Sequence, residues 1–354
     1  MKILLLSKYT RLGASSRVRS YQYLTYLKDR GLNITVSEFF SDEYLLALYK
    51  SGSHKIFIIL KAYLRRLLTL FKAGSYDLLW IEKELFPWLP AWTEQLLKLL
   101  GIRYIVDYDD AIFHKYDINK NRFIRWVLGS KIDTVMALSN CVFVGNDYLG
   151  ERAKSAGAPS VVKVPTVVNT DVYEVKRLHQ DKLVIGWIGT PITVKYLHIV
   201  SNALTELNRE IPFSLRLIGS GDFDIGDVDV QTVEWNEQTE VDEIQKFDIG
   251  IMPLPNEPWE RGKCGYKLIQ YMACGKVVVA SPVGENARIV DHGTDGFLAT
   301  STKEWIDALR FLMKDKESRE NMGNKARIKV EQQYSLSVSA PLLYKEIIKF
   351  DKGL

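Results

Sequence analysis

A short basic segment at residues 260–270, with the sequence ERGKCGYKLIQ, has the residue types that bind an anion. Lys263 and Lys267 lie on either side of Gly265, and Gln270 shares a helix face with Lys267 if the segment is helical. Glycine permits a close backbone approach, and the amides and dipole at a helix start favour negative charge. A glycine turn beside a solvated lysine face is the alternative, and the sequence leaves it open.

Lys195 is a second cation placed where it could act on a phosphate. It opens a predicted helix, shortly after a predicted strand and the small residues Gly189 and Thr190. A cation in that position would neutralise negative charge as it grows on a leaving group. Lysines are mostly exposed, so an ordinary solvated residue in the first helical turn is the alternative.

Carboxylates gather after another predicted strand, in the segment DYDDAIFH at residues 107–114. Three acids and a histidine within eight residues can bind a metal ion, but no second ligand cluster is evident in the sequence. We therefore favour contacts from Asp109, Asp110 and His114 to a polar substrate, with a structural role for His114 as an equal alternative. The upstream segment EKELFPW at residues 82–88 could line the same pocket or simply pack.

Small residues follow the first predicted strand at Gly13, Ala14 and Ser15. They would let backbone amides face a ligand, although the segment lacks the full dinucleotide-binding glycine pattern. A helix start capped by Ser15 or Ser16 is compatible with this interpretation.

Short apolar strands that alternate with helices must position these residues, and the sequence has that pattern twice. The predicted strands are Ile3–Leu6, Ile34–Glu38, Leu78–Ile81, Tyr104–Asp107 and Cys141–Val144, then Leu183–Ile188, Ser214–Ile218, Ile249–Met252 and Val277–Ala280. Predicted helices include Arg17–Arg30, Ala91–Leu100, Phe123–Leu138, Lys195–Asn208, Val241–Lys246, Tyr266–Ala273, Lys303–Lys314 and Ser335–Phe350. The alternation predicts two α/β domains with parallel sheets, whose ligands bind at the carboxyl ends of the strands.

Composition excludes several classes of protein. The net charge of the 354-residue chain is only +4, which gives no support for nucleic-acid binding. Its three scattered cysteines fit neither a disulfide framework nor a zinc site, so we expect a cytoplasmic protein. The N-terminal MKILLL predicts a strand rather than a signal peptide, and no stretch is apolar enough to predict a transmembrane helix.

The segment Lys55–Lys72, KIFIILKAYLRRLLTLFK, predicts a basic amphipathic helix. Lys61, Arg65 and Arg66 lie within one and a half turns, and we expect them to face one side. Such a helix could dock on the anionic inner face of a cell membrane, or could pack on the sheet of the first domain.

The second half resembles the signature of family-four (group 1) retaining glycosyltransferases of GT-B fold. The resemblance rests on QYMACGKVVVAS at residues 270–281, on GTDGFL at residues 293–298, and on Gly265 at the expected spacing. The segments VPTVVN at residues 164–169 and DIGIMPL at residues 248–254 are similar to further landmarks of that family.

This resemblance implies two Rossmann-like domains with parallel sheets that face each other across a cleft. Residues 1–168 would bind the acceptor, residues 169–334 would bind a nucleoside-diphosphate sugar, and a helix in residues 335–354 would cross back to the first domain. The implied reaction transfers a sugar to a glycan or lipid-linked acceptor, with retention of configuration and with no metal or other cofactor.

The resemblance also implies roles for single residues. Lys195, Asp109, Asp110 and His114 would be catalytic, and Gln270 would hold the ribose. The implied donor-binding residues are Gly13, Ala14, Ser15, Gly189, Thr190, Lys195, Lys263, Cys264, Gly265, Tyr266, Lys267 and Gln270.

The sequence departs from the family pattern at three positions. Gln270 replaces the second motif glutamate, Gly262 stands where the first is expected with Glu260 as a possible substitute, and Thr190 replaces an arginine. A non-catalytic nucleotide- or sugar-binding protein on the same fold is therefore the alternative function.

Overall fold

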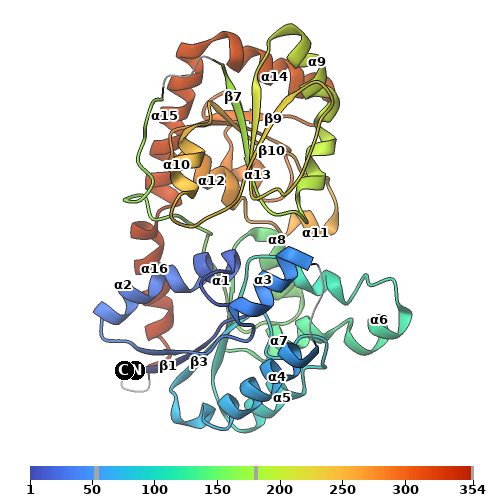
Figure 1. The fold of residues 1–354 in the computed structure, drawn as a ribbon. Coiled ribbons are helices and arrows are strands. Elements are labelled where there is room, and N and C mark those ends of the chain that lie inside the picture. Colours follow the sequence, from blue (N-terminus) through green and yellow to red (C-terminus); the bar gives the residue numbers. More distant parts are fainter. Residues whose placement is uncertain (52–55, 179–181, 352–354) are drawn as a thin grey trace. The chain divides into compact units, whose positions relative to one another are not determined.

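The computed structural model describes residues 1–51, 56–178 and 182–351, and these divide into two compact units (Figure 1). The first unit consists of Met1–Thr166, Gly262–Cys264 and residues 339–351. The second unit consists of Val167–Arg261 and Gly265–Val338. The first unit is thus assembled from both ends of the chain.

The first unit is built on a six-stranded parallel sheet with the order β2-β1-β3-β4-β5-β6. Its strands are β1 (Lys2–Leu6), β2 (Asn33–Val36), β3 (Leu78–Glu82), β4 (Tyr104–Tyr108), β5 (Cys141–Val144) and β6 (Val161–Lys163). The central strands β3, β4 and β5 are buried along their whole length, as expected of a parallel sheet covered on both faces.

Helices connect these strands as the alternating pattern predicts. They are α1 (Ala14–Arg19), α2 (Leu24–Asp29), α3 (Asp42–Ser51), α4 (Ile56–Leu70), α5 (Trp92–Leu99), α6 (Arg122–Leu128), α7 (Lys131–Leu138) and α8 (Asp147–Ser155). The continuous helices predicted at Arg17–Arg30 and Phe123–Leu138 are wrong. A 3₁₀ turn at Tyr21–Tyr23 divides the first of them, and Gly129 and Ser130 separate α6 from α7.

The second unit has its own six-stranded parallel sheet with the order β12-β11-β10-β7-β8-β9. Its strands are β7 (Val184–Ile188), β8 (Ser214–Ile218), β9 (Asp229–Val233), β10 (Ile249–Met252), β11 (Val277–Ala280) and β12 (Gly296–Leu298). The sequence analysis missed β6, β9 and β12, which are edge strands with few fully buried residues.

The helices of the second unit pack against this sheet. They are α9 (Ser201–Glu210), α10 (Glu240–Gln245), α11 (Pro258–Arg261), α12 (Tyr266–Ala273), α13 (Asn286–Ile289), α14 (Thr302–Lys314) and α15 (Lys316–Gln333). Side chains of α9, α14 and α15 form one apolar core with β7, β8, β10 and β11. Helix α16 (Leu336–Ile348) follows, and its residues from Ser339 onward belong to the first unit.

Each sheet reverses its strand order once. The chain passes from β1 to β2 on one side and then to β3 on the other, and it likewise places β8 and β10 on opposite sides of β7. Ligands of such open sheets bind in the crevice at the carboxyl ends of the two strands that flank this reversal. The fold therefore predicts ligand-binding sites at the carboxyl ends of β1 and β3, and of β7 and β10.

Candidate functional site

Charged and hydroxyl side chains fill the carboxyl ends of β1, β3 and β4 in the first unit. Lys83 is the central cation, with its Nζ 2.8 Å from Asp109 Oδ1 and 3.6 Å from Asp110 Oδ2. It also donates to Ser15 Oγ at 2.9 Å, and Ser15 donates to Asp109. Lys83 has a left-handed backbone with φ +68°, which is uncommon for a residue with a side chain. We name Ser15, Lys83, Asp109 and Asp110 the first-unit polar cluster.

The cluster holds one carboxylate in its charged form. Burial disfavours the charge on Asp109, but Lys83 and the hydrogen bonds from Lys83 and Ser15 outweigh burial and lower its pKa to about 2. Opposing effects act on Lys83, whose pKa is raised because Asp109 and Asp110 outweigh its burial. The cluster is therefore a preformed set of fixed charges that could orient the hydroxyl groups of a substrate.

Two further buried contacts hold α1 against the strands that carry this cluster. Ser16 Oγ donates to Glu82 Oε2 at 2.6 Å, and Arg19 forms a two-point pair with Asp107 at 2.6 and 3.0 Å. The alternative in which Ser15 or Ser16 caps α1 does not hold, because the N-cap is Gly13 and both serines lie inside the helix. Their hydroxyls bond to carboxylates from β3 and β4 instead.

Gly13 and Ala14 stand at the start of α1. A Cβ on Gly13 would come within 2.5 Å of the Tyr9 side chain, so close packing alone accounts for glycine there. Ala14 is the first residue of the helix.

His114 is held apart from the cluster by its own partners. Its Nδ1 lies 2.8 Å from Asp117 Oδ1, and its Nε2 lies 2.7 Å from the Tyr148 hydroxyl. Because both ring nitrogens are engaged, this geometry favours the structural alternative for His114 over proton transfer.

In the second unit, a lysine lies over an aromatic ring at the carboxyl end of β7. Lys267 Nζ, from the first turn of α12, lies 3.9 Å from the centroid of the Trp187 ring at the end of β7. A Cβ on Gly189 would lie 2.2 Å from that ring and 2.7 Å from Lys267 Nζ. Only glycine therefore fits at position 189, beside Lys267.

Lys195 lies farther along the same loop. It belongs to a 3₁₀ turn, Val194–Ile199, rather than to the α-helix that the sequence predicted. Its side chain is exposed, with Nζ 5.5 Å from the centroid of the Tyr196 ring. The Tyr196 hydroxyl in turn donates to the buried Glu260. Thr190 closes the loop through hydrogen bonds to Thr193.

Gln270 is buried inside the second unit, on the helix that begins after Gly265. Its Nε2 donates to the Tyr173 hydroxyl at 2.9 Å, and Tyr173 donates to Glu240 at 3.1 Å. Tyr266 also bonds to Tyr173. These contacts engage the Gln270 amide nitrogen with the protein.

Gly265 begins α12 with a left-handed backbone, φ +66°, and a Cβ there would lie 2.2 Å from Ile289. The residues before it, Gly262–Cys264, group with the first unit. Lys263 Nζ lies 3.6 Å from Asp110 Oδ1, and the Cys264 thiol donates to the Asp109 carbonyl at 3.2 Å.

The prediction that Lys61, Arg65 and Arg66 form one exposed basic face on α4 is wrong. Lys55 lies outside the described residues, and α4 starts at Ile56. Arg66 is 2% exposed and donates to the Ser7 carbonyl at 2.7 Å, while Arg65 pairs with Glu38 at 2.9 Å. These two arginines bind the polar backbone and side chains at the end of the sheet, so only Lys61 of the three is exposed.

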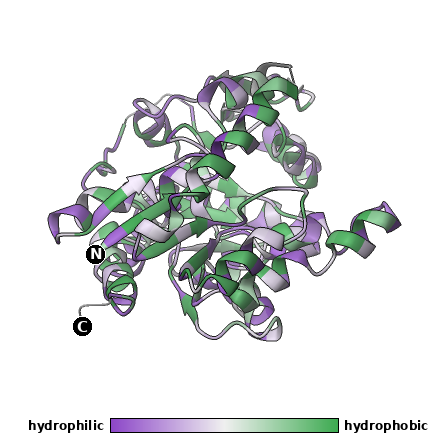
Figure 2. Cartoon of the chain, turned by 90° about the horizontal axis from the view of Figure 1, so that it is seen from below, coloured by the Kyte–Doolittle hydropathy of each residue, from purple (hydrophilic) through white to green (hydrophobic). Residues whose placement is uncertain are grey.

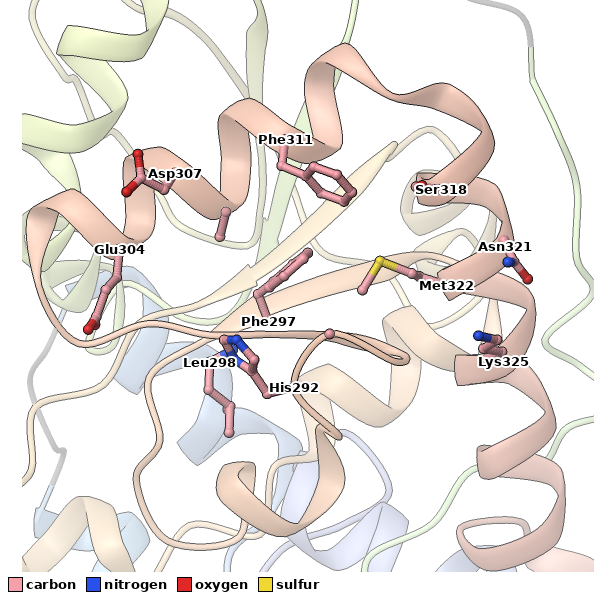
Figure 3. A pocket seen from close by; sticks show the side chains of 12 residues that line it. His292, Phe297, Leu298, Glu304, Asp307, Phe311, Ser318, Asn321, Met322 and Lys325 are labelled. Atoms are coloured by element: carbon pink, nitrogen blue, oxygen red, sulfur yellow. The ribbon is translucent and has the colours of Figure 1, made fainter.

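The described residues offer no metal site, since no three His, Cys, Asp or Glu side chains gather around one point in residues 1–51, 56–178 and 182–351. A cavity of about 750 Å³ lies beside β12, α14 and α15 (Figure 3). Phe297, Phe311 and Met322 line its middle, but Glu304 caps α14 and His292 accepts from the Leu298 amide. Its best-placed polar groups thus serve the fold, and no predicted site residue lines it.

Sequence reasoning missed Arg19, Lys83, Tyr173, Trp187 and Tyr196 as residues that organise these sites. Lys83 stood in a segment noted only for its acids and aromatics. Its position directly after a central strand was the available signal, because residues there lie at the ligand-binding edge. Tyr173 carried no such signal, since its partners Glu240 and Gln270 are far along the chain.

Comparisons with known proteins concern both the second unit and the whole chain. Residues 182–315 match the family described as "Glycosyl transferases group 1". N-acetyl-alpha-D-glucosaminyl L-malate synthase of Bacillus anthracis is 30% identical over 99 residues, which is 27% of this chain and 26% of that protein. The matched stretch therefore spans about a quarter of that relative.

Solved structures align along nearly the whole chain. Sucrose-phosphate synthase from Thermosynechococcus elongatus has a TM-score of 0.74 at 15% identity, covering 99% of this chain and 100% of its own. HepE of Anabaena, in complex with UDP-glucose, has a TM-score of 0.67 at 15% identity, covering 99% of each chain. Identity at this level shows a shared fold.

The two parallel sheets and these structural likenesses define a protein of GT-B fold. The predicted fold class is confirmed. Residues 182–315, in the second unit, are similar to the group 1 glycosyltransferases.

Proposed function

We propose that this protein transfers a sugar from a nucleoside-diphosphate sugar to a glycan or lipid-linked acceptor in the assembly of a cell-surface polysaccharide or glycoconjugate. The observation that carries the proposal is the convergence of Gly189, Trp187 and Lys267 at the carboxyl end of β7, within the segment that matches the family. HepE, which shares the fold, was solved with UDP-glucose, so UDP-sugars are the first donors to test.

The proposed donor site uses cations in place of the motif residues that are absent. Lys195 and Lys267 would hold the diphosphate, and the exposed end of Lys195 would neutralise charge on the leaving group. Lys267 already lies over Trp187, so little side-chain freedom is lost when it binds. We also propose that the transfer retains the anomeric configuration of the sugar and requires no metal or other cofactor.

The proposed acceptor site is the first-unit polar cluster. The charged Asp109 and Asp110 would accept hydrogen bonds from acceptor hydroxyls, and Lys83 would fix their positions. Ser15 is committed to Asp109 and Lys83 and so would orient the cluster rather than bind the donor.

We still propose that α4 docks on a membrane, but through its exposed apolar side chains rather than through a basic face. Phe57 and Phe71 are 82% and 79% exposed, whereas Arg65 and Arg66 are used within the fold. Docking would thus depend mainly on apolar insertion and only weakly on charge. No helix in the described ranges is long and apolar enough to cross a membrane.

The direct test of the function is donor binding followed by turnover. Saturating nucleoside diphosphate at one hundred times its dissociation constant should stabilise the protein by about 2.7 kcal/mol, and thermal unfolding across a panel identifies the base. Slow hydrolysis of the matching sugar donor should then release free nucleoside diphosphate. Binding without any hydrolysis or transfer would favour the non-catalytic alternative.

Replacing Gln270 with alanine separates a ligand contact from a structural one. We expect Gln270→Ala to weaken nucleoside diphosphate binding by roughly 1–2 kcal/mol, measured by calorimetry. Tyr173→Phe is the matched control, because it removes the same hydrogen bond without altering the glutamine side chain. If neither variant changes the dissociation constant, Gln270 only supports the fold.

A double change of Phe57→Ser and Phe71→Ser should reduce sedimentation with phospholipid vesicles at least about tenfold, since each exposed aromatic ring would contribute burial energy. High salt should reduce binding through α4 only modestly, because Arg66 is buried and Arg65 is paired with Glu38. Vesicle binding that vanishes in salt would restore the charge-based interpretation of α4.

A further inference from the structure

Large apolar side chains are exposed on one stretch of the chain far more than on the remainder of the described residues. Nine such side chains are more than 60% exposed, and eight of these lie between Ile56 and Trp126 in the first unit. Leaving so much apolar surface in water is unfavourable, and concentrations of it commonly mark interaction surfaces.

Residues 118–128, which include α6, form the part of this surface that we name the aromatic arm. Phe123 and Trp126 are 66% and 82% exposed, and their ring centroids lie 5.9 Å apart. Helix α6 projects from the first unit (Figure 1), and the projecting helix is coloured in a mixture of hydrophobic green and hydrophilic purple in Figure 2. The arm thus presents a pair of aromatic rings at a projecting point.

The arm is well organised, so the exposure does not come from a frayed helix. Asn121 caps α6 by accepting from the Phe123 amide at 2.9 Å. Arg125 bonds to the carbonyls of Asn119 and Lys120, and Leu128 is buried at the end next to α7. A fixed scaffold lowers the entropy lost when the rings bind a partner.

The charge of this surface indicates which partner fits it. Residues 118–128 contain three Lys or Arg and no Asp or Glu. On the arm itself, Lys120 and Arg122 are exposed beside the aromatic rings. Aromatic rings flanked by cations are typical of segments that lie in the interface of anionic membranes.

We propose that the aromatic arm inserts Phe123 and Trp126 into the interface of a bilayer that contains anionic lipid, with Lys120 and Arg122 at the headgroups. The proposal deepens the proposed function, on whose membrane partner it rests. A symmetric contact between two copies through this face would place their cations opposite one another, which disfavours a second copy of the chain as the occupant.

Vesicle sedimentation with the full chain tests the arm. The probes are vesicles of phosphatidylcholine alone and of phosphatidylcholine mixed with phosphatidylglycerol. Phe123→Ser with Trp126→Ser should bind both at least about tenfold more weakly than wild type. Ile328→Ser, which removes an exposed apolar side chain from α15 of the second unit, is the matched control and should bind like wild type.

A second variant tests the charge independently of the rings. Lys120→Glu with Arg122→Glu alters only exposed side chains and should abolish the preference for phosphatidylglycerol. This variant also tests the membrane role of the arm if the serine variant fails to fold. An unchanged preference would overturn the proposal, as would wild-type binding by the folded serine variant.

Two parallel measurements separate this inference from the proposed enzyme. Nucleoside diphosphate binding should be the same in all variants, because the arm lies in the first unit. If the wild type binds the nucleotide but neither kind of vesicle, the membrane role of the arm is wrong and the proposed enzymatic function is unaffected. If it binds vesicles but no nucleotide, the proposed enzymatic function is wrong and the membrane role of the arm is unaffected. A wild-type dimer in sedimentation velocity that the serine variant loses would assign the arm to a second copy instead.

Discussion

Replacing Lys195 with alanine is expected to lower turnover about a hundredfold or more while leaving the protein almost as stable as wild type. The side chain is exposed, so its removal leaves no buried cavity or unpaired charge. Its position follows from Tyr196, whose hydroxyl is fixed by the buried Glu260. Steady-state kinetics with the matching donor, alongside thermal unfolding, measure the two effects separately.

Lys303→Ala is the control for this experiment. Lys303 lies in the same unit with a side chain that is 88% exposed, and its loss should leave turnover unchanged. A Lys195→Ala enzyme that retains near-normal turnover would remove Lys195 from the site. A drop confined to KM would instead indicate that the lysine binds substrate and transition state equally.

The Lys83→Met variant is expected to lose about 3–5 kcal/mol of unfolding free energy at neutral pH, because it leaves buried carboxylates without their cation. Lys83 and Asp109 are only 4% and 12% exposed. Chemical denaturation measures the loss. Lys163→Met is the matched control, since its pair with Asp147 is partly solvated and should contribute at most about 1 kcal/mol.

Acid should narrow the difference between wild type and Lys83→Met. In wild type the pKa of Asp109 is lowered to about 2, so its stabilising effect is complete at neutral pH and is lost only as the pH falls toward that value. Without Lys83, burial would raise the Asp109 pKa, and protonation would then relieve the variant at mildly acidic pH. A difference that stays constant from neutral pH down to pH of about 3 would contradict this account.

The central strands were predictable because each is a short apolar run buried on both faces, as at Leu78–Glu82 and Val277–Ala280. The edge strands β6, β9 and β12 were not, since few of their residues are fully buried and β9 exposes most of its residues without an apolar pattern. Helix interruptions at Ser20 and Gly129 escaped notice because apolar periodicity continues across them. Periodicity reports burial and does not report a change of axis.

In the candidate sites, the glycines were predictable because their role depends only on the local backbone. Gly189 and Gly265 are required by close contacts at strand and helix ends, as their spacing suggested. Buried cations were not predictable in this way. Arg66 looks like a surface residue on an amphipathic helix, and only the Ser7 carbonyl, far away in the sequence, explains its burial.

The composition of the first unit from both ends of the chain has a consequence for truncated forms of the protein. Tyr23 hydrogen-bonds to Ser339 at 3.0 Å, and α16 buries Ala340, Leu343 and Ile347. The second unit contains no residue after Val338, so a chain that ends there would keep every residue of the second unit. The same truncation would remove part of the core of the first unit, so damage at the C-terminal end would destabilise the unit that contains the N-terminus.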